Sequence, residues 1–511
     1  MVSESQKNKR IAKNTFLLYI RMLILMVISL YTSRVILNSL GVIDYGIYNV
    51  VGGVVTMFTM ISGSLSTAIS RYLTFSLGKE DREKLNLIFS TSVNIQIIIS
   101  LIILLVAETF GLWFLNCKMT IPVDRWGAAN WVYQFSLLTF VINLISVPYN
   151  AAIIAHEKMS AFAYISIVEA IGKLLIAWLI VVDLVDRLIF YALMCAILSI
   201  IVRVIYSVYC KRNFDETCYK FIIDKSLLKD MFGFAGWNFL GASAMVLREH
   251  GGNLLINIFF GPAVNASRAI ATKINATVQS FVTNFMMALN PQITKSYASG
   301  NYHYMFKLMF QGTRLSFYMM LFLSLPIMLN IEFILKIWLK IVPYHATSFA
   351  CLVLILAMSD ILSGTLITAF LATGKVKRYQ IVVGTLQLLN LPITYVCYRV
   401  WGVPEIVMVI SILISNVAVF VRLLMLKELM PIKVKDYLLK VYLRVLFVAL
   451  LSAILPYILS LCLEVGFVRF VLTTLLSISL TSIIVYYIGC TMDERKLIVS
   501  KVLCLLAKIK H

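Results

Sequence analysis

The chain has 511 residues, 61% of them hydrophobic and 14% charged, and its formal net charge at pH 7 is +21. So apolar a composition excludes a soluble domain and indicates an integral membrane protein, and the charge therefore does not point to a nucleic-acid partner. The nine cysteines form no CxxC pair, and we expect neither a metal site nor a cofactor.

About fourteen hydrophobic segments are long enough to cross a bilayer. The first follows a basic stretch, residues 1–13, and is too long for the core of a signal peptide. An even number of spans places both termini on one side, and lysine and arginine concentrate in the connections on that side. We therefore predict cytoplasmic termini, with the excess positive charge facing anionic membrane lipids. The predicted spans are residues 14–39, 45–76, 87–108, 131–155, 160–182, 188–209, 231–259, 264–289, 305–329, 347–371, 379–398, 404–426, 439–462 and 467–489.

The first twelve spans form two halves that look alike. Gly41 and Gly78 bracket the second span, and Gly261 and Gly300 bracket the eighth, at an offset of about 220 residues. We interpret this as an internal repeat of parallel orientation, by which transporters build a central site between two bundles. The predicted class is an all-α membrane protein of two six-helix bundles with two added C-terminal helices. The predicted domains are an N-terminal bundle (1–210), a cytoplasmic linker (211–229), a C-terminal bundle (230–427), two further transmembrane helices (428–490) and an interfacial amphipathic tail (491–511).

Two arginines lie within the first span. Arg21 is about two turns from its start, on the helix face that carries Ser29 and Thr32, so it lines a cavity or its side chain extends to the headgroups. Arg34 lies near the outer end, where it binds an anion or pairs with Asp44 across the predicted turn. We also expect Asp44 to cap the start of the second span by accepting a backbone N–H.

The joint between the fourth and fifth spans carries His156, Glu157 and Lys158. We interpret it as a charged, solvated turn at the membrane face, with proton sensing by His156 as the alternative. In the fifth span Glu169 and Lys173 are four residues apart in the favourable order, so we expect them to neutralise each other. Glu169 is also a candidate to bind a coupling proton or sodium ion.

The seventh span contains three consecutive residues that carry charge or titrate, Arg248, Glu249 and His250. Consecutive helix residues point in different directions, so these three do not all face one cavity. We interpret Arg248 as an anion ligand and Glu249 as its partner, and Glu249 is also a candidate coupling site. Asp360 in the tenth span, flanked by serines, accepts a helix-end hydrogen bond or takes a coupling cation or proton.

The eighth span, residues 264–289, is unusually polar. Its polar residues recur every three or four positions, which places them in two neighbouring stripes on a helix. Such a helix lines a wet cavity, or its polar side chains join packed helices. Arg268 is the strongest single candidate, because its stripe is polar over its whole length. One stripe contains Asn265, Arg268, Thr272, Asn275, Gln279 and Thr283, and the other contains Lys273, Thr277, Ser280 and Asn284.

Three stretches carry a family resemblance. They are SRVILNSLGVIDYGIYNVVGG (Ser33–Gly53), with a Leu-Gly turn and an acidic-Tyr-Gly step, VPYNAAIIAHEKMSAFAYISIVEA (Val147–Ala170) and ILKIWLKIVPYH (Ile334–His345). With the six-plus-six repeat and two added spans, the chain resembles the Wzx-type flippases of lipopolysaccharide (O-antigen) and capsule biosynthesis. These belong to the polysaccharide-transport branch of the multidrug/oligosaccharidyl-lipid/polysaccharide (MOP) flippase superfamily.

The resemblance implies a MATE-like fold around a cationic central cavity, in the bacterial cytoplasmic (inner) membrane. It implies alternating access for an undecaprenyl-pyrophosphate-linked oligosaccharide, carried from the cytoplasmic to the outer leaflet, and makes polysaccharide polymerase and chain-length machinery candidate partners. Arginine suits pyrophosphate, because its forked donors match phosphate oxygens and it stays charged when buried. The expected binding set is Arg21, Arg34, Arg248, Arg268, Lys273, Asn265, Thr272, Asn275 and Gln279, and the expected ion-coupling set is Glu249, Asp360 and Glu169.

Two other functions compete with this one. A multidrug exporter of the same superfamily, moving small organic cations, would need acidic cavity residues, whereas the eighth span carries Arg268 and Lys273. A membrane enzyme such as a polymerase would need a large outer loop with catalytic carboxylates, and the predicted outer loops are short. The sequence also contains no phosphate-binding loop and no nucleophile elbow. We therefore expect a transporter rather than an enzyme, with the cation exporter as the alternative.

Overall fold

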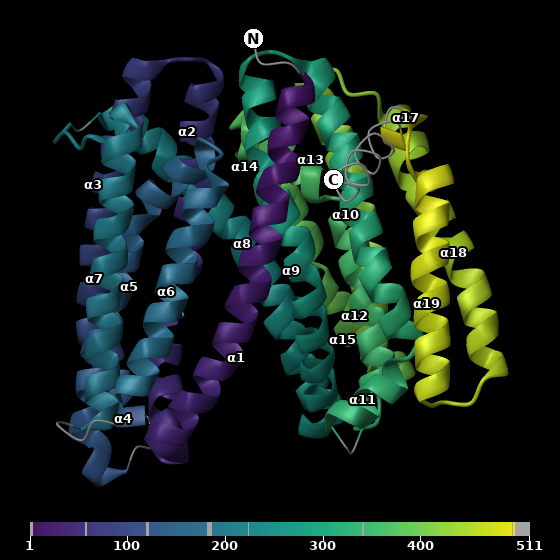
Figure 1. Ribbon diagram of the computed structural model, residues 1–511, viewed down its shortest axis with the longest axis horizontal. Coiled ribbons are helices and arrows are strands. Elements are labelled where there is room, and N and C mark those ends of the chain that lie inside the picture. Colours follow the sequence, from purple (N-terminus) through teal and green to yellow (C-terminus); the bar gives the residue numbers. More distant parts are fainter. Residues whose placement is uncertain are drawn as a thin grey trace, which may run out of the picture. The chain divides into compact units, whose positions relative to one another are not determined.

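The computed structural model describes residues 4–56, 59–118, 122–180, 186–222, 224–339, 342–492 and 494–495. All regular secondary structure in these ranges is helical (Figure 1), which confirms the predicted all-α class. Eleven helical segments of the described chain are long and apolar enough to cross a membrane. Three of the predicted spans, 45–76, 231–259 and 264–289, are not among them. The first is divided between two helices, Glu4–Thr56 and Thr59–Gly78. The other two lie in long helices whose polar side chains lower the hydropathy.

The chain divides into two compact units. Unit 1 comprises Met1–Ala242 and Met287–Asn301, and unit 2 comprises Ser243–Met286 and Tyr302–His511. Helices α8 (Lys225–Phe260) and α9 (Pro262–Ala298) therefore each belong partly to one unit and partly to the other. The five domains expected from the sequence are defined by the repeat rather than by compactness, and their boundaries stay a prediction.

Unit 1 is built from long apolar helices that pack on one another. Helix α5 packs against α7, α3 and α2, and α1 packs against α6 (Figure 1). Helix α3 continues through a π-helical turn, Ala107–Gly111, where the backbone oxygen of Ala107 accepts a hydrogen bond from the Tyr133 hydroxyl at 2.8 Å. The helices that lie wholly in this unit are α1 (Glu4–Thr56), α2 (Thr59–Gly78), α3 (Arg82–Val106), α4 (Leu112–Lys118), α5 (Trp126–Ala155), α6 (Met159–Leu179) and α7 (Arg187–Asn213).

The predicted turn at Gly41, with Asp44 as the cap of a second span, is wrong. Helix α1 continues through this region to Thr56, because glycine weakens a helix but keeps the N–H that the backbone ladder needs. The buried Asp44 carboxylate instead pairs with Arg125, whose guanidinium also lies 2.5 Å from an Asp186 oxygen. The side chain of Arg34 lies outside the described residues, so its predicted pairing stays open.

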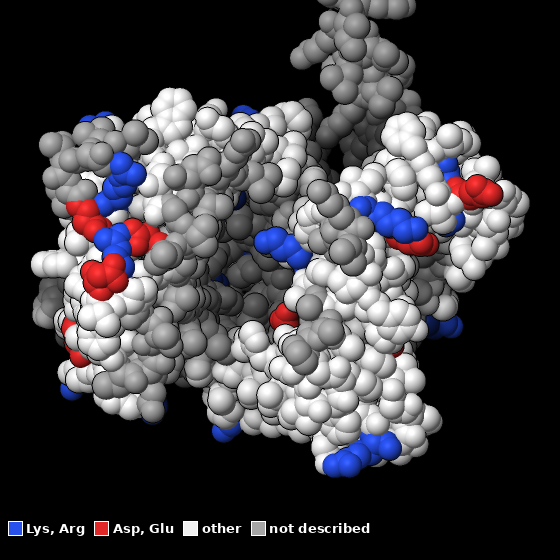
Figure 2. Space-filling view, turned by 90° about the horizontal axis from the view of Figure 1, so that it is seen from below, with Lys and Arg blue, Asp and Glu red and all other residues white. Residues whose placement is uncertain are grey.

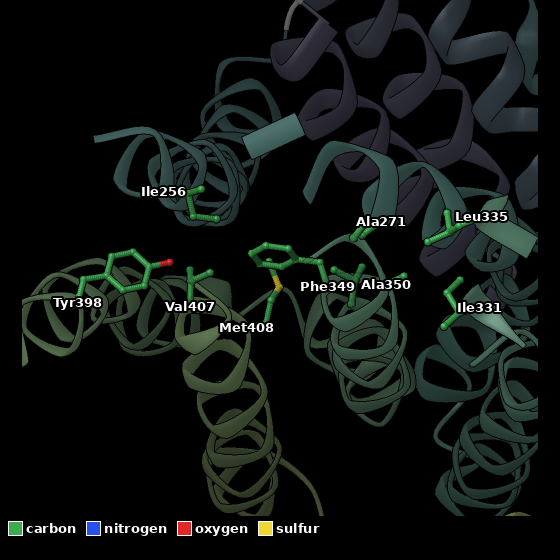
Figure 3. Close-up of a cluster of buried hydrophobic side chains, with 11 residues drawn as sticks. Ile256, Ala271, Ile331, Leu335, Phe349, Ala350, Tyr398, Val407 and Met408 are labelled. Atoms are coloured by element: carbon green, nitrogen blue, oxygen red, sulfur yellow. The ribbon is translucent and has the colours of Figure 1, made fainter. Parts of the chain in front are cut away.

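Side chains from six helices form an apolar core in unit 2 (Figure 3). The two added helices, α18 and α19, pack against each other and against α10. Polar contacts reinforce that seam, since Asn330 and Thr473 share hydrogen bonds and Arg469 donates to the backbone oxygen of Leu329 at 3.1 Å. The core cluster contains Ile256, Ala271, Ile331, Leu335, Ala346, Phe349, Ala350, Val353, Tyr398, Val407 and Met408. The remaining helices of the unit are α10 (Tyr302–Leu329), α11 (Ile331–Leu339), α12 (Ala346–Ile361), α13 (Gly364–Thr373), α14 (Val376–Leu388), α15 (Asn390–Trp401), α16 (Ile406–Leu429), α17 (Val434–Tyr437), α18 (Leu443–Cys462) and α19 (Phe467–Ile484).

The predicted amphipathic tail lies mostly outside the described residues, which end at Glu494 and Arg495. The last described part is tied to unit 2, because Glu494 accepts a hydrogen bond from the buried Arg314 at 2.6 Å. The interfacial placement of the tail stays a prediction.

Candidate functional site

A polar cavity of about 350 Å³ lies within unit 1, where α1, α6 and α7 meet. Its charged residues are Arg21, Glu169 and Lys173, which the sequence had singled out on two separate spans. The structure also places Ser29 and Thr32 in the cavity wall, on the helix face predicted for Arg21. The remaining lining residues are Leu25, Ile28, Ile36, Ser166, Ala170 and Tyr191.

The cations of this cavity differ in how they are compensated. Lys173 donates to Glu169 at 2.7 Å, as the spacing of four residues predicted, so that pair is neutral as a whole. Arg21 instead lies over the ring of Phe162, with the guanidinium carbon 4.4 Å from the ring centre. Its Nε is buried and has no hydrogen-bond partner among the described residues. The geometry thus favours the cavity interpretation of Arg21, whose guanidinium lies at the cavity wall and makes no ion pair with a carboxylate of the described residues.

A second cluster of polar side chains lies within unit 2, around Arg248 of α8. The guanidinium donates to the Gln387 amide oxygen at 2.7 Å and lies 3.6 Å from an Asp360 oxygen. Asp360 also accepts a hydrogen bond from Ser415 at 2.5 Å. The predicted partner of Arg248, Glu249, is therefore replaced by residues of α12 and α14, and Glu249 is exposed. The reason is helix geometry, since neighbouring residues of one helix diverge whereas facing helices bring side chains together.

Arg268 is buried, which differs from the open, cavity-lining position expected for it. Only 5% of the residue is exposed, and its Nη1 donates to the Asn253 side-chain oxygen at 2.7 Å. A Cβ added at Gly252 would lie 2.9 Å from the same nitrogen, so the glycine makes room for the guanidinium. Arg268 thus joins α8 to α9 inside unit 2, and its Nε remains buried without a partner in the described chain.

The rest of α9 is amphipathic, as its stripes predicted. Ala271, Val278, Val282 and Phe285 are buried. The predicted polar residues are mostly accessible: Lys273, Thr277, Gln279 and Thr283 are exposed, and Asn265, Thr272, Asn275 and Ser280 are half-buried, whereas Asn284 is buried. These exposures favour a wet polar face over buried polar joints between helices.

The sequence interpretation missed two clusters of charged side chains. One joins Asp44, Arg125 and Asp186 in unit 1. Figure 2 shows that acidic and basic side chains also lie next to one another on the surface in several places. The other cluster is at Glu157, which was expected to lie in a solvated turn but is only 3% exposed. Sequence spacing alone does not reveal either cluster, because their members are far apart in the chain. Among the described residues no cluster of His, Cys, Asp and Glu is arranged to hold a metal ion.

Comparison with known proteins supplies the family. A family model described as "Polysaccharide biosynthesis protein" matches residues 11–297, which is more than half of the chain. A second model, MatE, matches residues 245–396. No curated protein matches the chain.

Solved transporters share the fold. The chain is similar to an outward-facing multidrug resistance MATE family transporter of the MOP superfamily, at 12% identity and a TM-score of 0.69, over 81% of this chain and 94% of that one. It is similar to a MOP superfamily transporter from Pyrococcus furiosus, at 12% identity and a TM-score of 0.66, over 80% and 94%. It is also similar to a mutant of the Vibrio cholerae MATE transporter VcmN, at 16% identity and a TM-score of 0.68, over 82% of this chain and 96% of that one. From the family match and this shared fold, the chain belongs to the polysaccharide biosynthesis protein family and is a membrane transporter of the MOP superfamily.

Proposed function

We propose that this transporter is a Wzx-type flippase that moves an undecaprenyl-pyrophosphate-linked oligosaccharide from the cytoplasmic to the outer leaflet by alternating access. The membrane is then the bacterial inner membrane, with both termini in the cytoplasm and the basic connections facing anionic lipid. Its working partners are the enzymes that extend the chain, a polysaccharide polymerase and its chain-length machinery.

The observation that carries the proposal is the cavity around Arg21. A pyrophosphate carries negative charge, and moving it through a region of low dielectric constant without compensation costs many kcal/mol. Arg21 lines a cavity and is half-buried. Arg268 also keeps a buried Nε without a partner in the described chain, but it is only 5% exposed and donates to Asn253, and Arg248 donates to Gln387. We therefore assign phosphate binding first to Arg21 and give Arg248 and Arg268 positioning roles.

The exposed face of α9 supports a sugar cargo. It presents hydroxyl and amide groups, among them Thr272, Thr283 and Gln279, beside the ammonium of Lys273. Hydroxyls and amides offer both donors and acceptors, which is what sugar hydroxyls require. Helix α9 contains no aspartate or glutamate, so this face suits a neutral or anionic ligand better than a cationic drug.

Export of small organic cations remains the second candidate, because the MatE model matches residues 245–396. A cation site would need an acid whose charge is not already used. Glu169 pairs with Lys173 and Asp360 lies beside Arg248, so two of the three predicted acidic sites have internal cations. The same pairings argue against either acid as a simple coupling site, and coupling through Glu249 stays a proposal.

The test is complementation of a bacterial strain that lacks its own polysaccharide flippase. We expect the wild-type chain to restore surface polysaccharide, Arg21→Ala to abolish it and Arg21→Lys to retain part of it, because lysine keeps the charge but loses the fork. Arg378→Ala is the matched control, since that arginine is exposed and pairs with Glu428 on the surface. All variants are compared at equal abundance in the membrane.

The outcomes separate the two candidates. Full activity of Arg21→Ala would remove Arg21 from the cargo site. Failure of the wild type in strains with several different repeat units, together with efflux of a cationic dye from the same cells, would replace the flippase by the cation exporter.

A further inference from the structure

Glu157 occupies an unusual position in the turn between α5 and α6. Its backbone φ is +59°, a region that L-residues other than glycine seldom adopt, and the residue is 3% exposed. A carboxylate buried to this extent is tolerated only with close donors. Its surroundings therefore decide what the turn is for.

Three side chains supply those donors. Lys295 donates to one carboxylate oxygen at 2.6 Å, Gln292 donates to the other at 2.5 Å, and the Arg10 Nε lies 3.3 Å from the second oxygen. The backbone of the turn is used as well, since Asn14 donates to the Glu157 carbonyl at 3.0 Å. One turn thus holds the start of α1 and the end of α9 at the same time.

The end of α9 also meets α2 at very short range. A Cβ added at Gly78 would lie 2.8 Å from the Ala298 Cβ and 2.9 Å from the Lys295 backbone, so only glycine allows this approach. Next to it, the rings of Phe75 and Tyr297 are 6.3 Å apart. All of these residues belong to unit 1.

The other end of α9 belongs to unit 2 and is held there by different contacts. Arg268 donates to Asn253, and Ser267 donates to the Tyr344 backbone oxygen at 2.8 Å. The helix is therefore shared by both units, and its hold on unit 1 combines the close packing against α2 with one acid placed between two cations. Without the acid, Arg10 and Lys295 would repel each other.

We propose that Glu157 is a lock that holds the last turns of α9 in unit 1 and that has to open during the transport cycle. Alternating access needs contacts that form in one state and break in another. A group of charge-assisted hydrogen bonds to a single carboxylate meets this need, because it is strong when complete and is lost as a whole when the helix moves. The opening step rests on the proposed function, whereas the locked contact does not.

The first experiment measures the lock without transport. Hydrogen–deuterium exchange is followed in the purified full chain for the wild type, Glu157→Gln and Glu332→Gln. Glu332 is the matched control, because its carboxylate pairs with Lys336 on the surface. We expect Glu157→Gln to speed exchange of the α9 amides from Gln292 to Ala298 by about tenfold or more, as for the loss of a hydrogen bond to a charged group. We expect Glu332→Gln to leave these amides unchanged. Unchanged exchange in Glu157→Gln would overturn the lock.

The second experiment asks whether the lock opens. Phe75→Cys and Tyr297→Cys are combined, because the two rings that they replace are 6.3 Å apart, within reach of a short bis-methanethiosulfonate crosslinker that a reductant removes. The protein is placed in liposomes with undecaprenyl-pyrophosphate-linked N-acetylglucosamine, and a lectin added outside reports flipping. We expect crosslinking to stop flipping in the double variant, reduction to restore it, and each single variant to be insensitive to the reagent.

Flipping by the crosslinked double variant at the rate of the reduced one would overturn the opening step. If the wild type does not flip this lipid, the proposed function fails for this cargo, and hydrogen exchange still decides whether Glu157 holds α9. The two failures are thereby distinguishable.

Discussion

Arg248 and Asp360, separated by more than a hundred residues in the sequence, lie 3.6 Å apart inside unit 2. The Arg248 guanidinium also donates a hydrogen bond to Gln387, and the Asp360 carboxylate also accepts one from Ser415. Both charges therefore have partners on more than one helix. The acid that a sequence interpretation offers as a coupling site thus stands beside a cation that the chain itself provides.

The first prediction concerns this pair. Asp360→Ala and Arg248→Ala should each lower the stability of the solubilised protein by about 1 kcal/mol, a modest effect because Asp360 is about a third exposed. The double variant should lose less than the sum of the single losses, since each single change leaves a charge without its partner. The measurement is a double-mutant cycle on thermal unfolding. Strict additivity would show that the two side chains do not interact.

The second prediction concerns two glycines of the same helix. Gly252→Ala should destabilise the protein, because the new methyl group would lie 2.9 Å from the Arg268 Nη1 and 3.3 Å from Val407. The guanidinium would have to move and give up its hydrogen bond to Asn253 inside the protein, which costs more than alanine contributes to the helix. Gly233→Ala is the control: nothing lies within 4 Å of its added Cβ, and alanine favours the helix by about 1 kcal/mol. Melting temperatures should therefore fall for the first and stay level or rise for the second. Equal effects would mean that Arg268 is not held against α8.

The third prediction tests the bridge at Arg125. Its guanidinium reaches Asp44 of α1 and Asp186, the residue that caps the start of α7. Arg125→Lys should lose much of this link although it keeps the charge, because an ammonium lacks the planar fork that serves two carboxylates. Limited proteolysis of the connections near 119–125 and 181–186 is the measurement, with Arg125→Ala as the reference for complete loss. Wild-type protection in Arg125→Lys would show that charge alone suffices.

The fourth prediction compares a buried and an exposed ion pair. Arg314 and Glu494 have side chains that are 5% and 13% exposed, whereas those of Arg378 and Glu428 are 71% and 56% exposed. Removing Arg314 should cost about 3–5 kcal/mol, because Glu494 is left with an uncompensated charge. Removing Arg378 should cost less than about 1 kcal/mol. The measurement is thermal unfolding of Arg314→Ala and Arg378→Ala. Similar losses of stability in the two variants would contradict the assignment of Arg314 and Glu494 to a buried ion pair.

The sequence by itself determined the class of the protein and much of its helix content. Continuous apolar segments of bilayer length leave no alternative to helices, because lipid offers no partners for backbone groups. Local relations were also predicted correctly, such as the pairing of Lys173 with Glu169 and the polar and apolar faces of α9. These follow from the helical repeat alone, in which residues three or four apart share a face.

The tertiary structure decided which partner each charge has. Arg248 was assigned to its neighbour Glu249 and pairs with Asp360, Asp44 was expected to cap a helix and binds Arg125, and Glu157 was expected in solvent and is buried. In each case the partners come from distant parts of the chain, brought together by helix packing that the hydrophobic pattern does not specify. An apolar segment reveals that a helix is buried in lipid or protein, but not which neighbour its few charged side chains will meet. Those meetings are decided by the packing of whole helices, and only the folded structure contains them.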